Sequence, residues 1–301
     1  MNLFRRLGAA VLAMWLLLPS PAARAGEVLT AQFEAPSLGR AWKYDVYLPT
    51  GYAHSHQHYK VVYLLHGWGT DASSWITQTD VQAMADHLIA SGQMLPCILV
   101  MPQGRGSWYV DGPEKMETAF IDDLLPEIDH TYRTLPGREG RGIAGFSMGG
   151  YGTMRLALRH PDQFSAMAMM SPAIYAPLPP LTSAARVAPA FETGGSFDAA
   201  RWQQMNYPAL LDDFARSGYP MRVQLTAGLQ DALDTETAAS AFATLWRAHH
   251  WPCDLRLSPG GHDYAFWRRA LPMALRFLAP PPLVAELSLP NDPGAARTTM
   301  R

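Results

Sequence analysis

The sequence predicts one α/β domain in which a mostly parallel sheet is covered by helices on both faces. From residue 61 onward, short continuous apolar segments alternate with longer segments of helical spacing. Buried parallel strands joined by crossover helices give this pattern. The 301 residues are 48% hydrophobic and contain no acidic or basic block, which favours one large domain over two small ones.

The charge balance bears on the kind of partner. The formal net charge is only -2. A protein that binds nucleic acid through phosphate contacts usually has a basic stripe, and this sequence has none. We therefore expect a small-molecule partner, no nucleic acid and no cofactor. The sequence leaves the oligomeric state open.

The N-terminal residues have the features of a signal peptide over residues 1–25. Arg5 and Arg6 precede an apolar run over 7–18, and Ala23-Arg24-Ala25 gives the small-x-small pattern of a cleavage site before Gly26. The run is shorter than the roughly 20 residues that span a bilayer. No cysteine follows the site, which argues against a lipid anchor. We expect an exported protein, periplasmic or secreted, without a stable membrane anchor.

The predicted strands and helices follow in order along the mature chain. Residues 27–36 and 40–49 alternate apolar and polar side chains, which predicts a pair of antiparallel strands with an exposed face. The predicted buried strands are 61–65, 97–102, 141–146, 164–171, 222–228 and the segment that begins at Cys253. Helical spacing is clear over Thr118–Tyr132 and Thr235–His249.

Two segments depart from this alternation. Residues 174–220 are too long and too rich in proline for a plain connection, and their aromatic side chains argue against disorder, so we expect a cap-like insertion beside the site. Residues 279–301 lack any period and are predicted to be a proline-rich tail. The catalytic domain would then span residues 26–278.

Cys97 and Cys253 are the only cysteines. Each opens an apolar run, so each is expected to begin a buried strand. Those strands are not neighbours in the predicted sheet, whereas a disulfide needs Cα atoms within about 7 Å. We expect two separate buried thiols.

Ser147 is the candidate nucleophile. Gly145-Phe146-Ser147-Met148-Gly149 matches G-x-S-x-G, with a strand-like run before it and helical spacing after it. A nucleophile elbow needs this strand, turn and helix, because side chains at the flanking glycines would collide with neighbouring elements. The alternative is a glycine-rich turn with an incidental serine.

A serine hydroxyl is a weak nucleophile, so it needs a base and an orienting carboxylate. In a fold of this kind the expected chain order is serine, acid, histidine. Asp231 lies a few residues beyond the strand over 222–228 and is the preferred acid, with Asp234 as the competitor. His262 follows the last strand and two glycines and is the candidate base.

The other histidines are less suited to this role. His54, His56 and His58 could suggest a metal site, but no carboxylate or cysteine motif accompanies them, so a polar loop is favoured and no metal is expected. His160 ends a helix before Pro161, where a structural role fits the helix dipole.

Acyl transfer also needs donors for the developing oxyanion. The backbone N–H of Met148, directly after the nucleophile, is one candidate. The second is the backbone N–H of Trp68, in the loop His66-Gly67-Trp68-Gly69 after the strand over 61–65. His66 would hold that loop in place.

Four stretches of the sequence together resemble the esterase D-type branch of the α/β hydrolases, which includes tributyrin and feruloyl esterases, S-formylglutathione hydrolases and secreted mycolyltransferases. These stretches are "HGWGTDASSW", "MPQGRGSWYVDGP", "IAGFSMGGYGTMRLALRHPDQF" and "GGHDYAFW". The resemblance covers roughly residues 28–278. It implies an eight-stranded, mostly parallel sheet, with Ser147, Asp231 and His262 as the triad.

The resemblance also places Trp108 and Tyr109 where related carboxylesterases line the acyl or alcohol pocket. Both are therefore candidate substrate-binding residues, with packing as the alternative. The cysteine associated with some S-formylglutathione hydrolases has no counterpart here. The favoured function is an exported serine carboxylesterase acting on short-chain or aryl esters. The alternatives are an acyltransferase with the same triad and a hydrolase-fold binding protein without chemistry; acyl and alcohol specificity stay open.

Overall fold

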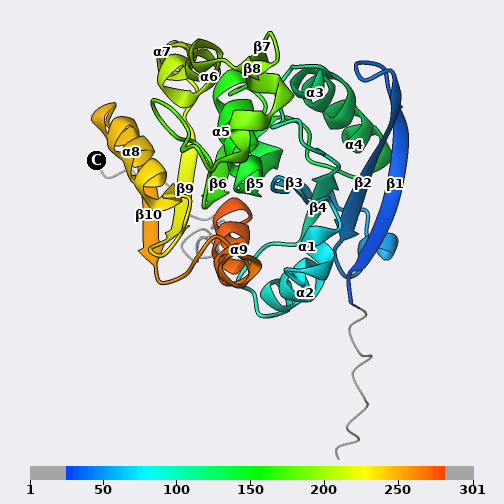
Figure 1. The fold of residues 1–301 in the computed structure, drawn as a ribbon. Coiled ribbons are helices and arrows are strands. Elements are labelled where there is room, and N and C mark those ends of the chain that lie inside the picture. The colour runs from blue at the N-terminus through cyan, green and yellow to red at the C-terminus, as the bar shows by residue number, and fades with distance from the viewer. Residues whose placement is uncertain (1–24, 282–301) are drawn as a thin grey trace, which may run out of the picture.

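The computed structural model describes residues 25–281 (Figure 1). The predicted signal peptide, apart from Ala25, and the predicted tail beyond residue 281 lie outside these residues. Within residues 25–281 no helix is both long enough and apolar enough to cross a membrane.

A single large sheet of eight strands forms the centre of the described domain, in the order β1-β2-β4-β3-β5-β6-β9-β10. The strands are β1 (Glu27–Ala35), β2 (Arg40–Leu48), β3 (Lys60–Leu65), β4 (Cys97–Pro102), β5 (Arg141–Phe146), β6 (Ala166–Met170), β9 (Arg222–Gly228) and β10 (Cys253–Ser258). β1 pairs antiparallel with β2, and β2 pairs antiparallel with β4; every other pairing in this sheet is parallel. The prediction of a parallel sheet entered through an antiparallel edge is confirmed.

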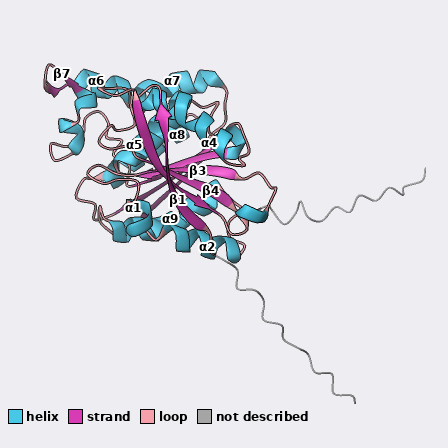
Figure 2. Ribbon diagram, turned by 90° about the vertical axis from the view of Figure 1, so that its right-hand side faces the viewer, coloured by secondary structure: helices cyan, strands magenta, loops and turns pink. Residues whose placement is uncertain are grey.

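Helices cover both faces of the sheet (Figure 2). One face packs against α1 (Ser74–Thr77), α2 (Val81–Ala90) and α9 (Tyr264–Leu278). The other packs against α3 (Met116–Thr118), α4 (Leu125–Thr131), α5 (Met148–Arg159), α6 (Ala199–Met205), α7 (Tyr207–Ser217) and α8 (Thr235–Ala248). This arrangement is an α/β-hydrolase fold, as the sequence predicts.

The alternation of side chains along a strand explains the two separate cores. In β3, Val61, Tyr63 and Leu65 enter one core, while Val62 and Leu64 enter the other. Successive side chains of a strand point to opposite faces, so a strand that is covered on both sides must be apolar throughout. The continuous apolar segments of the sequence have this cause.

The segment Thr118–Tyr132 differs from the single regular helix that its spacing predicts. α3 leads into a π-helical stretch over Ala119–Leu124, and α4 follows it. Pro126 lies at the start of α4 and lacks an N–H, and its ring would clash with the carbonyl four residues earlier in a regular helix. A local change to a wider turn relieves that clash.

The two cysteines lie far apart in the sheet order, on β4 and β10, and both are free thiols. Cys97 is fully buried, but Cys253 is only partly buried, which corrects the expectation of two buried thiols. Its strand β10 is at the edge of the sheet, so it has only one neighbouring strand, β9.

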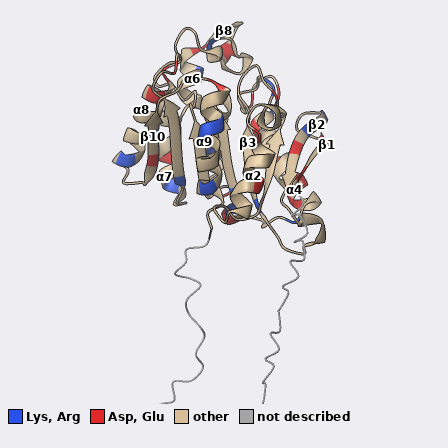
Figure 3. Cartoon of the chain, turned by 90° about the horizontal axis from the view of Figure 1, so that it is seen from below, with Lys and Arg blue, Asp and Glu red and all other residues tan. Residues whose placement is uncertain are grey.

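Charged side chains are distributed over the described elements. In Figure 3 the basic and acidic positions are scattered over several helices and strands and do not gather on one of them. This arrangement agrees with the small net charge of -2.

Candidate active site

Ser147 lies at a sharp turn between β5 and α5. Its backbone has φ 54 and ψ -119, which a non-glycine residue rarely adopts. A Cβ atom at Gly145 would lie 2.3 Å from the Gly149 carbonyl oxygen, and one at Gly149 would lie 2.0 Å from the Leu65 carbonyl oxygen. Both glycines are therefore required by close backbone approaches. The turn is the strand–turn–helix arrangement that the sequence predicts.

Three side chains from separate loops form a hydrogen-bonded line at the carboxyl ends of the strands. Nε2 of His262 is 2.9 Å from Oγ of Ser147, and Nδ1 of His262 is 2.7 Å from Oδ2 of Asp231. The serine follows β5, the aspartate follows β9, and the histidine follows β10. Parallel strands end at the same edge of a sheet, which is why residues so far apart in sequence meet here.

Asp231 is held as an ionised hydrogen-bond acceptor. Its side chain is buried, and burial by itself raises the pKa of a carboxyl group, but hydrogen bonds from His262 and Thr235 outweigh burial and hold the pKa of Asp231 below its ordinary value. The Leu233 N–H also donates to Oδ1 over 2.9 Å. An ionised carboxylate can only accept, so Nδ1 of His262 carries the hydrogen and Nε2 is free to accept from Ser147.

Asp234, the competing acid, is in a different position. It precedes α8 with φ 54 and is exposed to solvent. Among the described residues its carboxylate has no hydrogen bond with His262, whereas Asp231 has one. The geometry therefore favours Asp231.

Close packing fixes the position of His262. A Cβ at Gly228 would lie 2.3 Å from the Gly260 carbonyl oxygen, so β9 and the loop that carries the histidine approach closely because of glycine. The imidazole packs edge-on against Trp267, with ring centroids 5.1 Å apart. Trp267 in turn stacks on Phe146 at 4.3 Å. Phe146, the residue before Ser147, thereby supports His262 through the ring of Trp267.

The loop after β3 lies against the elbow. A Cβ at Gly67 would be 2.8 Å from Cε2 of Phe146 and 3.5 Å from Cβ of Ser147. Among residues 25–281, neither the Trp68 N–H nor the Met148 N–H donates to a protein acceptor. Two backbone donors next to the serine are thus available to a bound oxygen.

His66 holds this loop, in agreement with its expected structural role. Its Nε2 accepts a hydrogen bond from the Gly104 N–H at 2.9 Å, so Nδ1 carries the hydrogen and donates to the Gly67 carbonyl at 2.9 Å. Burial lowers the pKa of His66, which favours this neutral form. Tyr109 donates its hydroxyl hydrogen to the His66 carbonyl at 3.2 Å.

Trp108 and Tyr109 lie in the core, and this placement favours packing over substrate contact. Their side chains are fully buried, and both have positive φ, 56 and 57. The Trp108 ring makes edge contacts with Tyr151, Phe191 and Trp202. Trp108 also contacts Trp68, with ring centroids 6.5 Å apart, and Tyr109 bonds to His66, so both residues pack against the loop after β3.

The insertion over residues 174–220, expected to be cap-like, packs most of its aromatic side chains into the core. Tyr175, Phe191, Trp202 and Tyr207 are buried, and Phe197 is partly buried. α7 has an apolar face, but that face packs on α8, with Phe214 5.2 Å from Trp246. Its aromatic residues therefore do not form an open surface over the triad.

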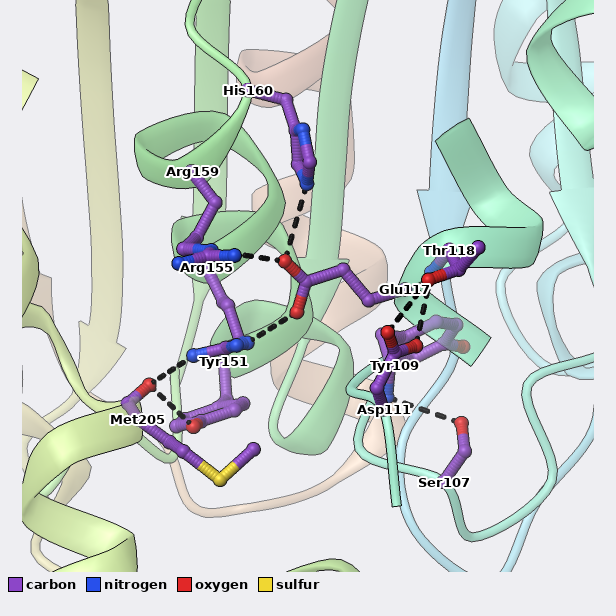
Figure 4. A network of polar contacts seen from close by, with 10 residues as sticks. All are labelled: Ser107, Tyr109, Asp111, Glu117, Thr118, Tyr151, Arg155, Arg159, His160 and Met205. Atoms are coloured by element: carbon purple, nitrogen blue, oxygen red, sulfur yellow. Dashed lines mark hydrogen bonds and ion pairs between the residues drawn. The ribbon is translucent and has the colours of Figure 1, made fainter. Parts of the chain in front are cut away.

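A buried ionic network, which sequence reasoning missed, holds α5 in place (Figure 4). Nε of Arg155 is 2.6 Å from the Glu117 carboxylate, and Arg159 and His160 also contact that carboxylate. Burial raises the pKa of Glu117, but these hydrogen bonds and charges outweigh burial and bring it to about 2. Glu117 is therefore ionised throughout the neutral range. Two basic residues four apart among apolar neighbours in "MRLALR" were the available sequence signal.

The same network reaches the insertion. Nη1 of Arg155 donates to the Met205 carbonyl at 2.9 Å, and the Tyr151 hydroxyl donates to the same oxygen at 2.8 Å. Arg155 and Tyr151 are on α5, the helix that begins directly after Ser147. The helix of the candidate nucleophile is thus tied both to α3 and to the end of α6.

His54 ends a short 3-10 helix (Tyr52–His54), and His56 and His58 lie in the loop that follows it; all three histidines are exposed. No group of three or more His, Cys, Asp or Glu residues suited to a metal ion occurs in the described part of the chain.

Comparison with known proteins shows the family of this chain. The protein family described as putative esterase matches residues 35–278. The chain belongs to this family. A solved structure of a ferulic acid esterase superposes with a TM-score of 0.70 at 29% identity, covering 85% of this chain and 98% of that one.

Two curated proteins are similar to this chain over shorter stretches. An endo-1,4-beta-xylanase/feruloyl esterase of Xylanibacter ruminicola is 35% identical over 162 residues, which is 50% of this chain and 22% of the relative. An esterase of Mycobacterium tuberculosis is 36% identical over 142 residues, which is 45% of this chain and 30% of the relative. The matched stretches thus cover less than a third of either relative.

Proposed function

We propose that this member of the esterase family is a serine carboxylesterase, with Ser147 as nucleophile, His262 as general base and Asp231 as the orienting acid. The hydrogen-bonded line from Ser147 through His262 to Asp231 carries the proposal. Family membership supports it independently.

The arrangement accounts for each step of ester hydrolysis. The Ser147 hydroxyl attacks the ester carbonyl while Nε2 of His262 takes its proton, and the imidazolium then gives that proton to the departing alcohol. The N–H groups of Trp68 and Met148 stabilise the oxyanion of the tetrahedral intermediate. In the second half, His262 takes a proton from the water that attacks the acyl-enzyme. The bond to Oγ of Ser147 then breaks, the imidazolium returns the proton to that oxygen, and the carboxylic acid leaves.

Esters with a short acyl chain or an aryl group are the proposed substrates. The cavity beside Trp68 has a volume of about 320 Å³. That volume is near the lower end of the range for small-molecule sites, and it suits a short or ring-sized group better than a long lipid chain. The names of the ferulic acid esterase and of the xylanase/feruloyl esterase relative support aryl esters as candidates.

Hydrolysis is expected to dominate over transfer to another alcohol. We expect free carboxylic acid to be the main product from a 4-nitrophenyl ester of a short acid even with concentrated glycerol or sugar present, because a cavity of about 320 Å³ is not a long apolar tunnel that would keep water away from the acyl-enzyme. Mass spectrometry of the products is the measurement. Predominant transfer of the acyl group to the added alcohol would show an acyltransferase, the main alternative. Absence of both products would favour a binding protein.

The proposed oxyanion donors predict different effects for two neighbouring substitutions. Gly67→Val places side-chain atoms against Phe146 and Ser147 and should displace the Trp68 N–H, lowering kcat by roughly a hundredfold to a thousandfold, as loss of one such donor does. Trp68→Phe keeps the backbone and should retain much of the rate.

The measurement for this pair is the rate per active site, titrated with a phosphonate ester. This normalisation separates misfolding from lost chemistry, because unfolded molecules do not react with the titrant. An unchanged rate per titrated site in Gly67→Val would rule out the oxyanion role of this loop.

Export to the periplasm or beyond is also part of the proposal. It is supported by the basic, apolar and small-x-small segments over residues 1–25 of the sequence. N-terminal sequencing of the protein recovered outside the cytoplasm tests it, and Gly26 is the expected first residue.

A further inference from the structure

The cavity beside Trp68 combines apolar walls with charged side chains. It has a volume of about 320 Å³ and includes no member of the proposed triad. Its apolar wall consists of Trp68, Val110, Pro113, Pro189 and Ala190. Its lining also includes two charged residues, Arg105 and Glu114, and the polar Ser107, with Gly106 and Gly112 between them in the sequence. Because Trp68 belongs both to this wall and to the proposed oxyanion loop, the cavity adjoins the place where the ester carbonyl would bind.

The charges in this cavity do not cancel. The Glu114 carboxylate accepts two hydrogen bonds from Arg40, at 2.9 and 2.7 Å. These bonds, with a smaller contribution from the charge of Arg105, hold the pKa of Glu114 below its ordinary value. The guanidinium of Arg105 makes no hydrogen bond or ion pair with another residue in the range 25–281. Glu114 is thus paired with Arg40, and the exposed side chain of Arg105 carries a positive charge without a carboxylate partner among residues 25–281.

The loop that carries Arg105 is held in a fixed conformation. Arg105 has φ 49, an uncommon backbone angle for a side chain of its size, and such residues persist where the surroundings fix them. On one side, the Gly104 N–H is bonded to His66. On the other, the Ser107 hydroxyl donates to the Gly104 carbonyl at 2.7 Å.

Gly106 brings this loop directly against Trp68. A Cβ atom at Gly106 would lie 2.8 Å from Cζ3 of the indole, so a larger residue there would displace the Trp68 ring. The Trp68 indole and the loop that carries Arg105 thus form one continuous wall of the cavity.

We propose that Arg105 makes the enzyme selective for esters that carry an anionic group, in the simplest case a carboxylate, at the far end of an apolar or aromatic body. This inference rests on the proposed esterase function. An ester whose carbonyl oxygen meets the Trp68 N–H would extend one of its two groups along the indole into the cavity. A guanidinium is the side chain best suited to meet a carboxylate there, because its parallel N–H donors match the two carboxylate oxygens.

The test compares matched esters that differ in charge. 4-Acetoxybenzoate and 4-acetoxybenzamide have the same acyl group, and the charge lies on the leaving alcohol. 4-Nitrophenyl hydrogen adipate and 4-nitrophenyl hexanoate place the charge on the acyl chain instead. For each pair, the measured quantity is kcat/KM of the charged ester divided by kcat/KM of the neutral ester. In the pair whose charged end reaches the cavity, we expect Arg105→Asn to lower this ratio about tenfold. Loss of one charge-assisted hydrogen bond has an effect of this size. Asparagine is chosen because it tolerates positive φ.

Two further variants serve as controls. Arg105→Lys keeps the charge but lacks the parallel pair of N–H donors, so it is expected to keep only part of the preference. Arg276→Gln removes the same charge near the far end of α9, away from His262, and should leave the ratio as it is in the unmodified protein.

Each other outcome counts against a specific statement. If Arg105→Asn leaves both ratios unchanged, or if the unmodified protein prefers neither charged ester, the role of Arg105 is wrong while the esterase function stands. 4-Nitrophenyl acetate is the reference for that function. Failure to hydrolyse 4-nitrophenyl acetate and all four test esters would contradict the proposed function itself.

Discussion

Replacing Ser147 with alanine is expected to abolish ester hydrolysis, with a loss on the order of 10⁴ to 10⁶ in kcat. The proposed nucleophile is then absent, and only the oxyanion donors and substrate binding remain. The measurement is the hydrolysis rate of 4-nitrophenyl butyrate, alongside the thermal unfolding temperature. We expect the fold to be kept, because alanine removes a single oxygen and leaves the backbone turn as it is.

Ser171 offers a matched control for this substitution. It directly follows the neighbouring strand β6, is buried and also has a positive φ of 42. Its hydroxyl has no hydrogen-bond partner among the described residues. Ser171→Ala should therefore leave kcat nearly unchanged. A Ser147→Ala variant that keeps about a tenth of the activity would be incompatible with covalent catalysis at this residue.

Asp231→Asn is expected to lower kcat by about 10⁴, the effect of losing the carboxylate of a serine–histidine pair. An amide can present its NH₂ group to Nδ1 of His262, which then favours the tautomer with the hydrogen on Nε2. That nitrogen could no longer accept the proton of Ser147. The measurement is kcat for the same ester, corrected for the active-site titre.

Asp234→Asn is the matched control for the acid. Asp234 lies three residues further on, is exposed, and has no contact with His262 among the hydrogen bonds of the described chain. Asparagine also tolerates its positive φ of 54. The activity of Asp234→Asn should remain close to that of the unmodified protein. The reverse ranking of the two variants would move the acid to Asp234, and equal mild losses would exclude both.

The order and type of the main elements were predictable because they depend on local patterns. Buried parallel strands are apolar along their whole length, so the strand ending at Phe146 and the one beginning at Arg222 are evident from the sequence alone. The π-helical stretch before Pro126 was not predicted, because apolar spacing shows a helical face but not the width of each turn.

The candidate site divides in the same way. Ser147 and His262 each lie beside glycines that are close in the sequence, so local patterns point to both residues. The structure brings their side chains together with Asp231. The burial of Trp108 depends on rings from α5 and the insertion, which are distant in sequence. The ion pair between Glu117 and Arg155 likewise joins residues 38 positions apart. Such contacts are set by the fold, so side-chain type and spacing do not reveal them.

The central claim is that an acyl group is carried on Ser147, and trapping that intermediate tests it most directly. The protein is mixed with a 4-nitrophenyl ester, quenched with acid within the first turnover, digested, and analysed by mass spectrometry. The account predicts one acyl group per molecule, on the peptide containing Ser147, and none in Ser147→Ala. An acyl group on another residue, or continued turnover in Ser147→Ala without any acylated peptide, would contradict it.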